Sequence, residues 1–233
     1  MPTPEEIRRG VADLLVTGTD SGVGKTVVAA ALVLALRERG ITAVGFKPVE
    51  TGVGDDDVPD SVVLAAASGV DAPLARPLMQ LAEHLAPAVA AERAGLVLDV
   101  KALERRLPGL YAAGFTVVVE GTGGLLAPLA WGYTALDLAA RCGLQAVVVG
   151  RAGLGTLNHC MLTAGALQAR GVAVRGVILN EPSDPPNLAE STNPAALAQL
   201  LPGVPVVVLP RHPTRDPLEA ARRSVPFVSG LLG

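Results

Sequence analysis

Six short runs of apolar, mostly β-branched residues recur along the chain, and they constrain its fold more than any other feature. The runs are continuous rather than alternating, which is typical of strands buried on both faces of a parallel sheet. They occupy residues 13–18, 43–47, 116–120, 146–150, 174–180 and 204–210. Helical patterns separate them, at residues 26–39, 60–67, 100–112, 136–142, 157–170 and 195–201. This alternation predicts an α/β fold with a doubly wound, mostly parallel sheet.

The length of the chain fits one such domain. Its 233 residues, of which 50% are hydrophobic, are enough for one compact core but few for two independent cores. We therefore expect a single domain over residues 1–233, in which residues 1–10 form an N-terminal extension. Residues 181–187, with the sequence EPSDPPN, are expected to form a surface loop.

Composition argues against two classes of partner. The chain has 19 basic and 22 acidic residues and only 3% aromatic residues, so we expect neither an electropositive surface nor stacking platforms for nucleic acid. The longest apolar run, residues 27–36, is shorter than the roughly 20 residues of a membrane-spanning helix. The first ten residues contain no apolar secretory segment, so we expect a cytoplasmic protein without a membrane partner. Cys142 and Cys160 have no metal-ligand spacing and are expected to be small buried thiols.

A glycine-rich loop follows the first predicted strand. It reads GTDSGVGKT over residues 18–26 and leads directly into a predicted helix. Glycines let backbone N–H groups turn toward phosphate oxygens, and a helix N-terminus adds the positive end of its dipole. Lys25 would reach the β- and γ-phosphates, and the Thr26 hydroxyl would ligate magnesium. The strict P-loop pattern has glycine six residues before the lysine, where this chain has Thr19 with Gly18 one residue further back, so the sequence predicts a nucleotide site on a longer, variant P-loop.

Charged residues close the second and third predicted strands, which should end at the same edge of the sheet as the loop. Lys47 ends the second strand, and Glu120 ends the third, followed by glycines that permit a ligand to approach the backbone. Glu120 fits a magnesium-binding acid of the Walker B type, and Asp60 offers another oxygen ligand. Alternatively, Lys47 and Glu120 are solvated strand ends, and Asp60 is only a helix N-cap.

Three further positions are chemically ambiguous. Asn180 closes the fifth predicted strand, and its amide could either bind the edge of a purine or shape the turn that follows. Residues 151–159 lead into a helix whose free N–H groups would suit a carboxylate, or would simply begin the helix. The histidines share no ligand spacing, and we assign none of them to catalysis.

Four segments together resemble the dethiobiotin synthetase family: GTDSGVGKT, KPVETG, VVVEGTGGLLAPL and GLGTLNH. They occur in the family's order, at the expected strand ends, and span the chain. The resemblance implies a P-loop NTPase-like fold and an enzyme of biotin biosynthesis that requires Mg²⁺ and uses ATP as co-substrate. Such an enzyme closes a cyclic urea on 7,8-diaminopelargonate with CO2, and yields dethiobiotin, ADP and phosphate. The resemblance also implies a homodimer whose substrate site lies at the subunit interface.

The resemblance assigns roles to individual residues. Lys25 and Lys47 are the catalytic lysines, and the magnesium ligands are Thr26, Asp60 and Glu120, with Asp57 as an alternative to Asp60. The ATP-binding residues are Gly22, Val23, Gly24, Lys25, Thr26, Val27, Asp60, Glu120, Gly121, Thr122, Gly123, Asn180, Glu181 and Pro210. The substrate-binding residues are Ser21, Lys47, Thr51, Gly155 and Asn158. Gly22 departs from the family pattern, because several relatives carry glutamate there.

Three other classes of protein share a sheet and loop of this kind. A partner-regulating ATPase of the deviant-Walker type usually has an additional lysine near the start of the loop, where this chain has Thr19, Asp20 and Ser21. An amidotransferase-type ligase would need a glutaminase module, for which we expect no room in the chain. A GTPase would need an NKxD motif for its base, which the sequence lacks. The partner-regulating ATPase is the main alternative.

Overall fold

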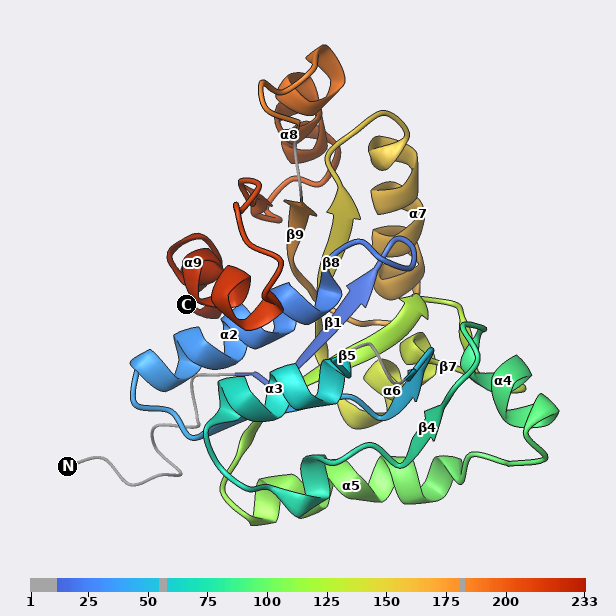
Figure 1. Cartoon of the computed structure of the whole chain (residues 1–233). Coiled ribbons are helices and arrows are strands. Elements are labelled where there is room, and N and C mark those ends of the chain that lie inside the picture. Colours follow the sequence, from blue (N-terminus) through green and yellow to red (C-terminus); the bar gives the residue numbers. More distant parts are fainter. Residues whose placement is uncertain (1–11, 55–57, 181–182) are drawn as a thin grey trace.

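A computed structural model describes residues 12–54, 58–180 and 183–233, which are arranged around a six-stranded sheet (Figure 1). The strand order is β10-β9-β8-β1-β5-β2, and every pair of neighbours is parallel. These strands are β1 (Leu14–Gly18), β2 (Ala43–Phe46), β5 (Thr116–Gly124), β8 (Gln145–Arg151), β9 (Val174–Asn180) and β10 (Val206–Val208). Two small sheets accompany them, formed by β3 (Val49–Thr51) with β4 (Met79–Leu81) and by β6 (Pro128–Ala130) with β7 (Tyr133–Thr134).

Helices connect the strands and cover both faces of the sheet. They are α2 (Lys25–Glu38), α3 (Asp60–Ser68), α4 (Pro87–Arg93), α5 (Val100–Ala112), α6 (Ala135–Cys142), α7 (Thr156–Ala169), α8 (Leu188–Leu200) and α9 (Pro217–Val228). Two short 3-10 helices, η1 (Pro73–Ala75) and η2 (Ser229–Leu232), complete the described elements. None of the helices within the described ranges has both the length and the apolar character needed to cross a lipid bilayer.

The sheet separates two hydrophobic cores because successive side chains of a strand point to opposite faces. In β1, Leu14 and Val16 pack into the core beneath α2, α3 and α9, whereas Leu15 packs into the core beneath α5, α6, α7 and α8. Both faces of each central strand are therefore buried, as the continuous apolar runs predict. The predicted doubly wound, parallel fold is confirmed.

Several element boundaries differ from the predicted ones. The predicted helix over 195–201 is wrong at its beginning, because α8 starts at Leu188 behind a capping box formed by Asn187 and Glu190 and includes Pro194. The last strand is shorter than predicted, and the sequence analysis missed α4, α9 and the two small sheets. Of the two cysteines, Cys160 is buried as expected, whereas Cys142 is partly exposed.

Candidate active site

A cavity of about 860 Å³ lies at the carboxyl ends of the central strands. The loop between β1 and α2 forms one of its walls. Lys47, which follows β2, and Glu120 on β5 form another wall, together with Asp60 at the beginning of α3. Strand β5 lies between β1 and β2 in the sheet, so Glu120 is placed between the loop and Lys47. The cavity therefore lies where open parallel sheets bind ligands.

The loop depends on glycine at a defined position. Gly24 caps α2 with φ of 93°, in the left-handed region. A Cβ atom at this position would lie 1.7 Å from Nδ2 of Asn180, which itself donates a hydrogen bond to the Val23 carbonyl. Lys25 is 6% exposed, and its ammonium donates to the Asp20 carbonyl at 2.9 Å. The backbone and the lysine thus adopt the curled arrangement that a phosphate loop requires.

Lys47 is the buried centre of a polar network. It is 4% exposed, and its Nζ lies 2.6 Å from both Oδ2 of Asp60 and Oε1 of Glu120. The Thr26 hydroxyl lies 2.8 Å from Oδ1 of Asp60 and 3.0 Å from Oε1 of Glu120. The carboxylates of Asp60 and Glu120 therefore both contact the ammonium of Lys47, and the Thr26 hydroxyl lies within hydrogen-bond distance of both carboxylates.

The surroundings shift the pKa values of these groups. Burial, followed by the positive charge of Lys47, lowers the pKa of Lys25 to about 8, so it remains mostly protonated at neutral pH. Burial also opposes the charged form of Lys47, but the carboxylates of Glu120 and Asp60 outweigh it and raise the pKa of Lys47 above its ordinary value. For Asp60, burial acts to raise the pKa, but the Lys47 charge outweighs this effect and holds it below its usual range. The two carboxylates thus favour the protonated, cationic form of Lys47.

The same residues fit a magnesium ion. Mg²⁺ prefers hard oxygen ligands and is usually held by one or two carboxylates together with phosphate oxygens. Thr26, Asp60 and Glu120 supply a hydroxyl and two carboxylates, and the hydroxyl lies within hydrogen-bond distance of both carboxylates. Oε2 of Glu120 is buried and accepts no hydrogen bond from the described part of the chain. Such an unsatisfied anionic oxygen is costly unless a cation or donor meets it.

Comparison with known proteins identifies the family. A family model described as an AAA domain matches residues 12–221. The ATP-dependent dethiobiotin synthetase BioD of Anaeromyxobacter sp. (strain K) is 45% identical over 203 residues, which cover 86% of this chain and 90% of the relative. That of Mycobacterium leprae (strain TN) is 43% identical over 193 residues, covering 81% of this chain and 83% of the relative. The chain belongs to the dethiobiotin synthetase family.

Solved structures support the fold assignment. The septum site-determining protein MinD of Pyrococcus horikoshii, complexed with Mg-ADP, has a TM-score of 0.58 at 22% identity, and the match covers 94% of this chain and 91% of that chain. The MinC:MinD complex of Aquifex aeolicus has a TM-score of 0.53 at 15% identity, covering 93% and 88%. At these identities the likeness shows that this dethiobiotin synthetase family member shares their fold.

The structure brings most of the predicted site residues of this dethiobiotin synthetase family member to the cavity. Those that line it are Ser21, Gly22, Gly24, Lys25, Thr26, Val27, Lys47, Thr51, Asp60, Glu120, Thr122 and Gly123. Those that do not are Val23, Gly121, Gly155, Asn158, Asn180 and Pro210. Glu181 and Asp57, the alternative to Asp60, lie outside the described residues.

Two of the ambiguous residues have clear contacts. Asp60 is not the N-cap of α3, because that position is Pro59, and its carboxylate is directed to Lys47 and Thr26 instead. Asn180 is 7% exposed and holds the phosphate loop through its hydrogen bond to Val23. The side-chain amide of Asn180 therefore donates to the protein backbone. Its contact with the base of the nucleotide stays a prediction.

The sequence analysis missed part of the cavity wall. His84, Leu85 and Ala86, from the segment between β4 and α4, and Pro87, the first residue of α4, also line the cavity. His84 lies directly against Gly52, where a Cβ atom would approach its Nδ1 to 2.2 Å. A strand of three residues and a helix of seven leave too little periodicity to be recognised in the sequence.

Proposed function

We propose that the protein carboxylates 7,8-diaminopelargonate with CO2 and closes the ring with ATP, which gives dethiobiotin, ADP and phosphate in biotin biosynthesis. The observation that carries this proposal is the position of Lys47. Its ammonium shares one cavity with the phosphate loop and lies between the carboxylates of Asp60 and Glu120. A second cation beside the triphosphate site would reduce the repulsion between two reacting anions, here the carbamate and ATP. The family's ATP-dependent ligase activity supplies such a reaction.

The chemistry proceeds in three steps. One substrate amine adds to CO2 and loses a proton, giving a carbamate. A carbamate oxygen then attacks the γ-phosphorus of ATP, and ADP leaves. Finally, the second amine attacks the activated carbonyl carbon, loses a proton and expels phosphate, which closes the cyclic urea. In these steps Lys25 holds the phosphates while Lys47 offsets the carbamate charge, so positioning and charge neutralisation provide most of the catalysis.

Thr26, Asp60 and Glu120 would hold the magnesium ion. When bound with ATP, the ion supplies positive charge to the phosphate oxygens and orients them for transfer. The buried Oε2 of Glu120 supports this assignment, because a buried carboxylate oxygen without a hydrogen bond is stabilised by a bound cation.

The proposed substrate site includes residues from a second copy of the chain. Gly155 and Asn158, at the beginning of α7, do not line the cavity of their own chain. Apolar side chains are exposed close by, with Leu154 in the loop before α7 95% exposed and Leu162 on α7 65% exposed, which suits a buried interface. We infer a homodimer in which the N–H groups at the start of α7 from one subunit bind the substrate carboxylate next to the phosphate loop of the other.

The direct test is incubation with 7,8-diaminopelargonate, bicarbonate, ATP and magnesium, followed by mass spectrometry. We expect the mass of the cyclic urea, and phosphate release that depends on the diamine. Phosphate release without diamine and without cyclic urea, from well-folded protein, would favour the partner-regulating ATPase.

The two site lysines should differ in effect. Lys25→Ala should weaken ATP binding about 10- to 100-fold, because it removes a charged hydrogen bond to phosphate. Lys47→Gln should leave ATP affinity nearly unchanged and lower kcat by at least about 100-fold, the size expected when a preorganised charge is removed. Calorimetry and steady-state kinetics measure both. The remaining lysine of the sequence, Lys101, is exposed on α5, so Lys101→Gln is the matched control. Equal losses of ATP affinity in Lys25→Ala and Lys47→Gln would contradict these roles.

Glu120→Gln should raise the magnesium concentration needed for half-maximal turnover by at least about tenfold, because it replaces an anionic ligand with a neutral one. A titration of turnover against magnesium measures this. Glu38→Gln, at the exposed end of α2, serves as control. An unchanged magnesium dependence in Glu120→Gln would show that Glu120 is not a ligand.

Complementation tests the shared site. Lys25→Ala disables the phosphate side, and Gly155→Asp places a repelling carboxylate at the start of α7. Each variant alone should be nearly inactive. After subunit exchange, about half of the dimers are mixed, and one of the two sites in each is free of lesions, so activity should return to about a quarter of wild type.

A second mixture checks the same point. Here a chain that carries both substitutions is mixed with wild type. If sites are shared between subunits, both sites of every mixed dimer contain a lesion. Only the wild-type homodimers, about a quarter of all dimers, then remain active, which leaves about a quarter of the activity. Sites built within one chain would leave about half, and would give no recovery in the first mixture.

A further inference from the structure

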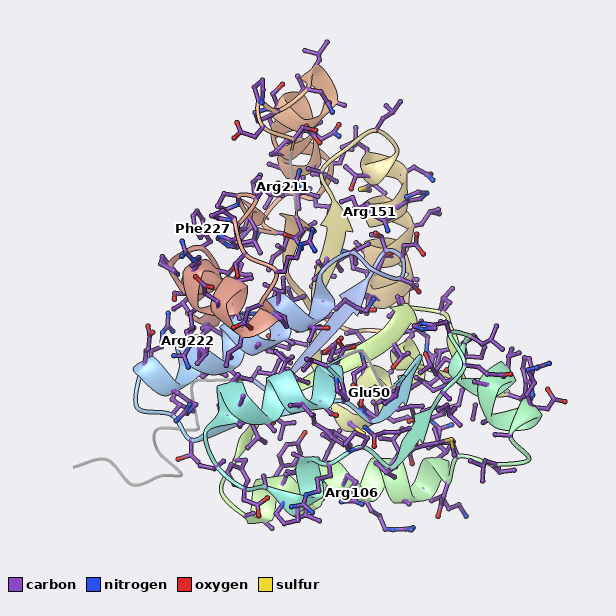
Figure 2. All side chains as sticks on the ribbon, in the orientation of Figure 1. Glu50, Arg106, Arg151, Arg211, Arg222 and Phe227 are labelled. Carbon is purple, nitrogen blue, oxygen red and sulfur yellow. The ribbon has the colours of Figure 1, made fainter. Side chains whose placement is uncertain are left out.

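Glu50 is a buried acid that the proposed mechanism does not use. It lies on β3 and is 3% exposed, close to the beginning of α3 (Figure 2). Oε1 accepts a hydrogen bond from the Ser61 backbone N–H at 2.8 Å. Oε2 accepts hydrogen bonds from the Ser61 hydroxyl at 2.8 Å and from the Gln80 amide at 2.9 Å. The carboxylate thus joins β3, β4 and α3.

The beginning of α3 lacks a cap of its own. Its N-cap residue is Pro59, which makes no side-chain capping bond. The first N–H groups of a helix have no partner within the helix and are usually met by a side chain at the N-cap. Here Glu50, from a neighbouring strand, takes that place, and its negative charge lies at the positive end of the helix dipole.

This arrangement leaves Asp60 free for the active site. Asp60 is the first residue of α3, a position from which short acidic side chains often bond to the helix N-terminus. Its oxygens instead bond to Thr26 and to Lys47. Ser61, the next residue, is held by both its backbone and its side chain. The backbone next to Asp60 is therefore fixed by contacts between residues that do not line the cavity.

We propose that Glu50 is a positioning residue for Asp60. By capping α3 from β3, it fixes the first helical turn so that the Asp60 carboxylate meets Thr26 and the magnesium that enters with the nucleotide. This role rests on the proposed function of Asp60 as a magnesium ligand. A merely structural role would stabilise the fold without acting through Asp60.

A double-mutant cycle separates the two roles. The four proteins are wild type, Glu50→Ala, Asp60→Ala and the double variant, and the readout is calorimetric binding of the β,γ-imido analogue of ATP with and without magnesium. We expect Glu50→Ala to reduce the affinity gained from magnesium about tenfold, as for other residues that orient ligands. In the Asp60→Ala background the same change should reduce it no further. An equal loss in both backgrounds, or none in either, overturns the proposal.

Two conservative variants keep the test valid if Glu50→Ala folds poorly. Glu50→Gln retains an oxygen that accepts from the Ser61 N–H and an amide that donates to its hydroxyl, so it should keep most of the magnesium effect. Ser61→Ala removes one of the three bonds and should have an intermediate effect that also disappears in the Asp60→Ala background. A Glu50→Gln effect as large as that of Asp60→Ala, or a Ser61→Ala effect that persists without Asp60, counts against the proposal.

A matched control is available at another helix. Asp99 caps α5 by accepting from the Ala102 N–H, and α5 contributes no residue to the cavity. Asp99→Ala should lower the melting temperature and leave the magnesium effect unchanged. Assaying wild type for the cyclic urea distinguishes a failure of the proposed function from a failure of the positioning role of Glu50. A wild type without product refutes the proposed function, whereas an active wild type with an additive cycle refutes only the role of Glu50.

Discussion

The contact between Lys47 and Glu120 is the interaction on which the rest of the site depends. Both side chains are almost fully buried, and a buried charge is tolerated only when it is paired and hydrogen-bonded. Removing one partner of such a pair typically costs about 3–5 kcal/mol, because the other charge is left without compensation. The remaining polar contacts follow from this constraint: Thr26 donates toward both acids, Asp60 supplies the second counter-charge, and Glu50 holds the helix that carries Asp60.

The order of strands explains why these residues meet. Lys47 and Glu120 are 73 residues apart in sequence, yet β2 pairs directly with β5, and β5 pairs with β1. The sequence predicts that each residue closes a buried strand, and parallel strands end at one edge, so the cluster is expected. The strand order itself is not predicted, because each apolar run is compatible with any central position. Only the observed order places Glu120 between the phosphate loop and Lys47.

Asp60 illustrates where sequence reasoning stops. An acid ahead of an apolar helix is compatible with both capping and metal binding, since the same carboxylate can do either. The choice is made by a residue of another element: Glu50 caps α3, and Asp60 is left to the cavity. Asn180 is similar, because its bond to Val23 crosses between β9 and the loop after β1. Interactions of this kind depend on tertiary packing and leave no local pattern. The capping box that begins α8, by contrast, is local and could have been recognised from Asn187 and Glu190.

The balance of charge connects this geometry to the proposed reaction. Burial raises the pKa of Glu120, and the charge of Lys47 acts against this effect. With both acids ionised, the two negative charges of Asp60 and Glu120 cancel the two positive charges of Lys25 and Lys47. Such a cluster can be buried in the free enzyme, whereas two unpaired lysines could not. In the proposed reaction Asp60 and Glu120 would hold the magnesium ion, which would supply positive charge to the phosphate oxygens of ATP. The ammonium of Lys47, which lies against both carboxylates, would offset the charge of the anionic carbamate. A lysine held only by solvent would be neither buried nor fixed in position, which gives a physical reason for placing Lys47 between two acids.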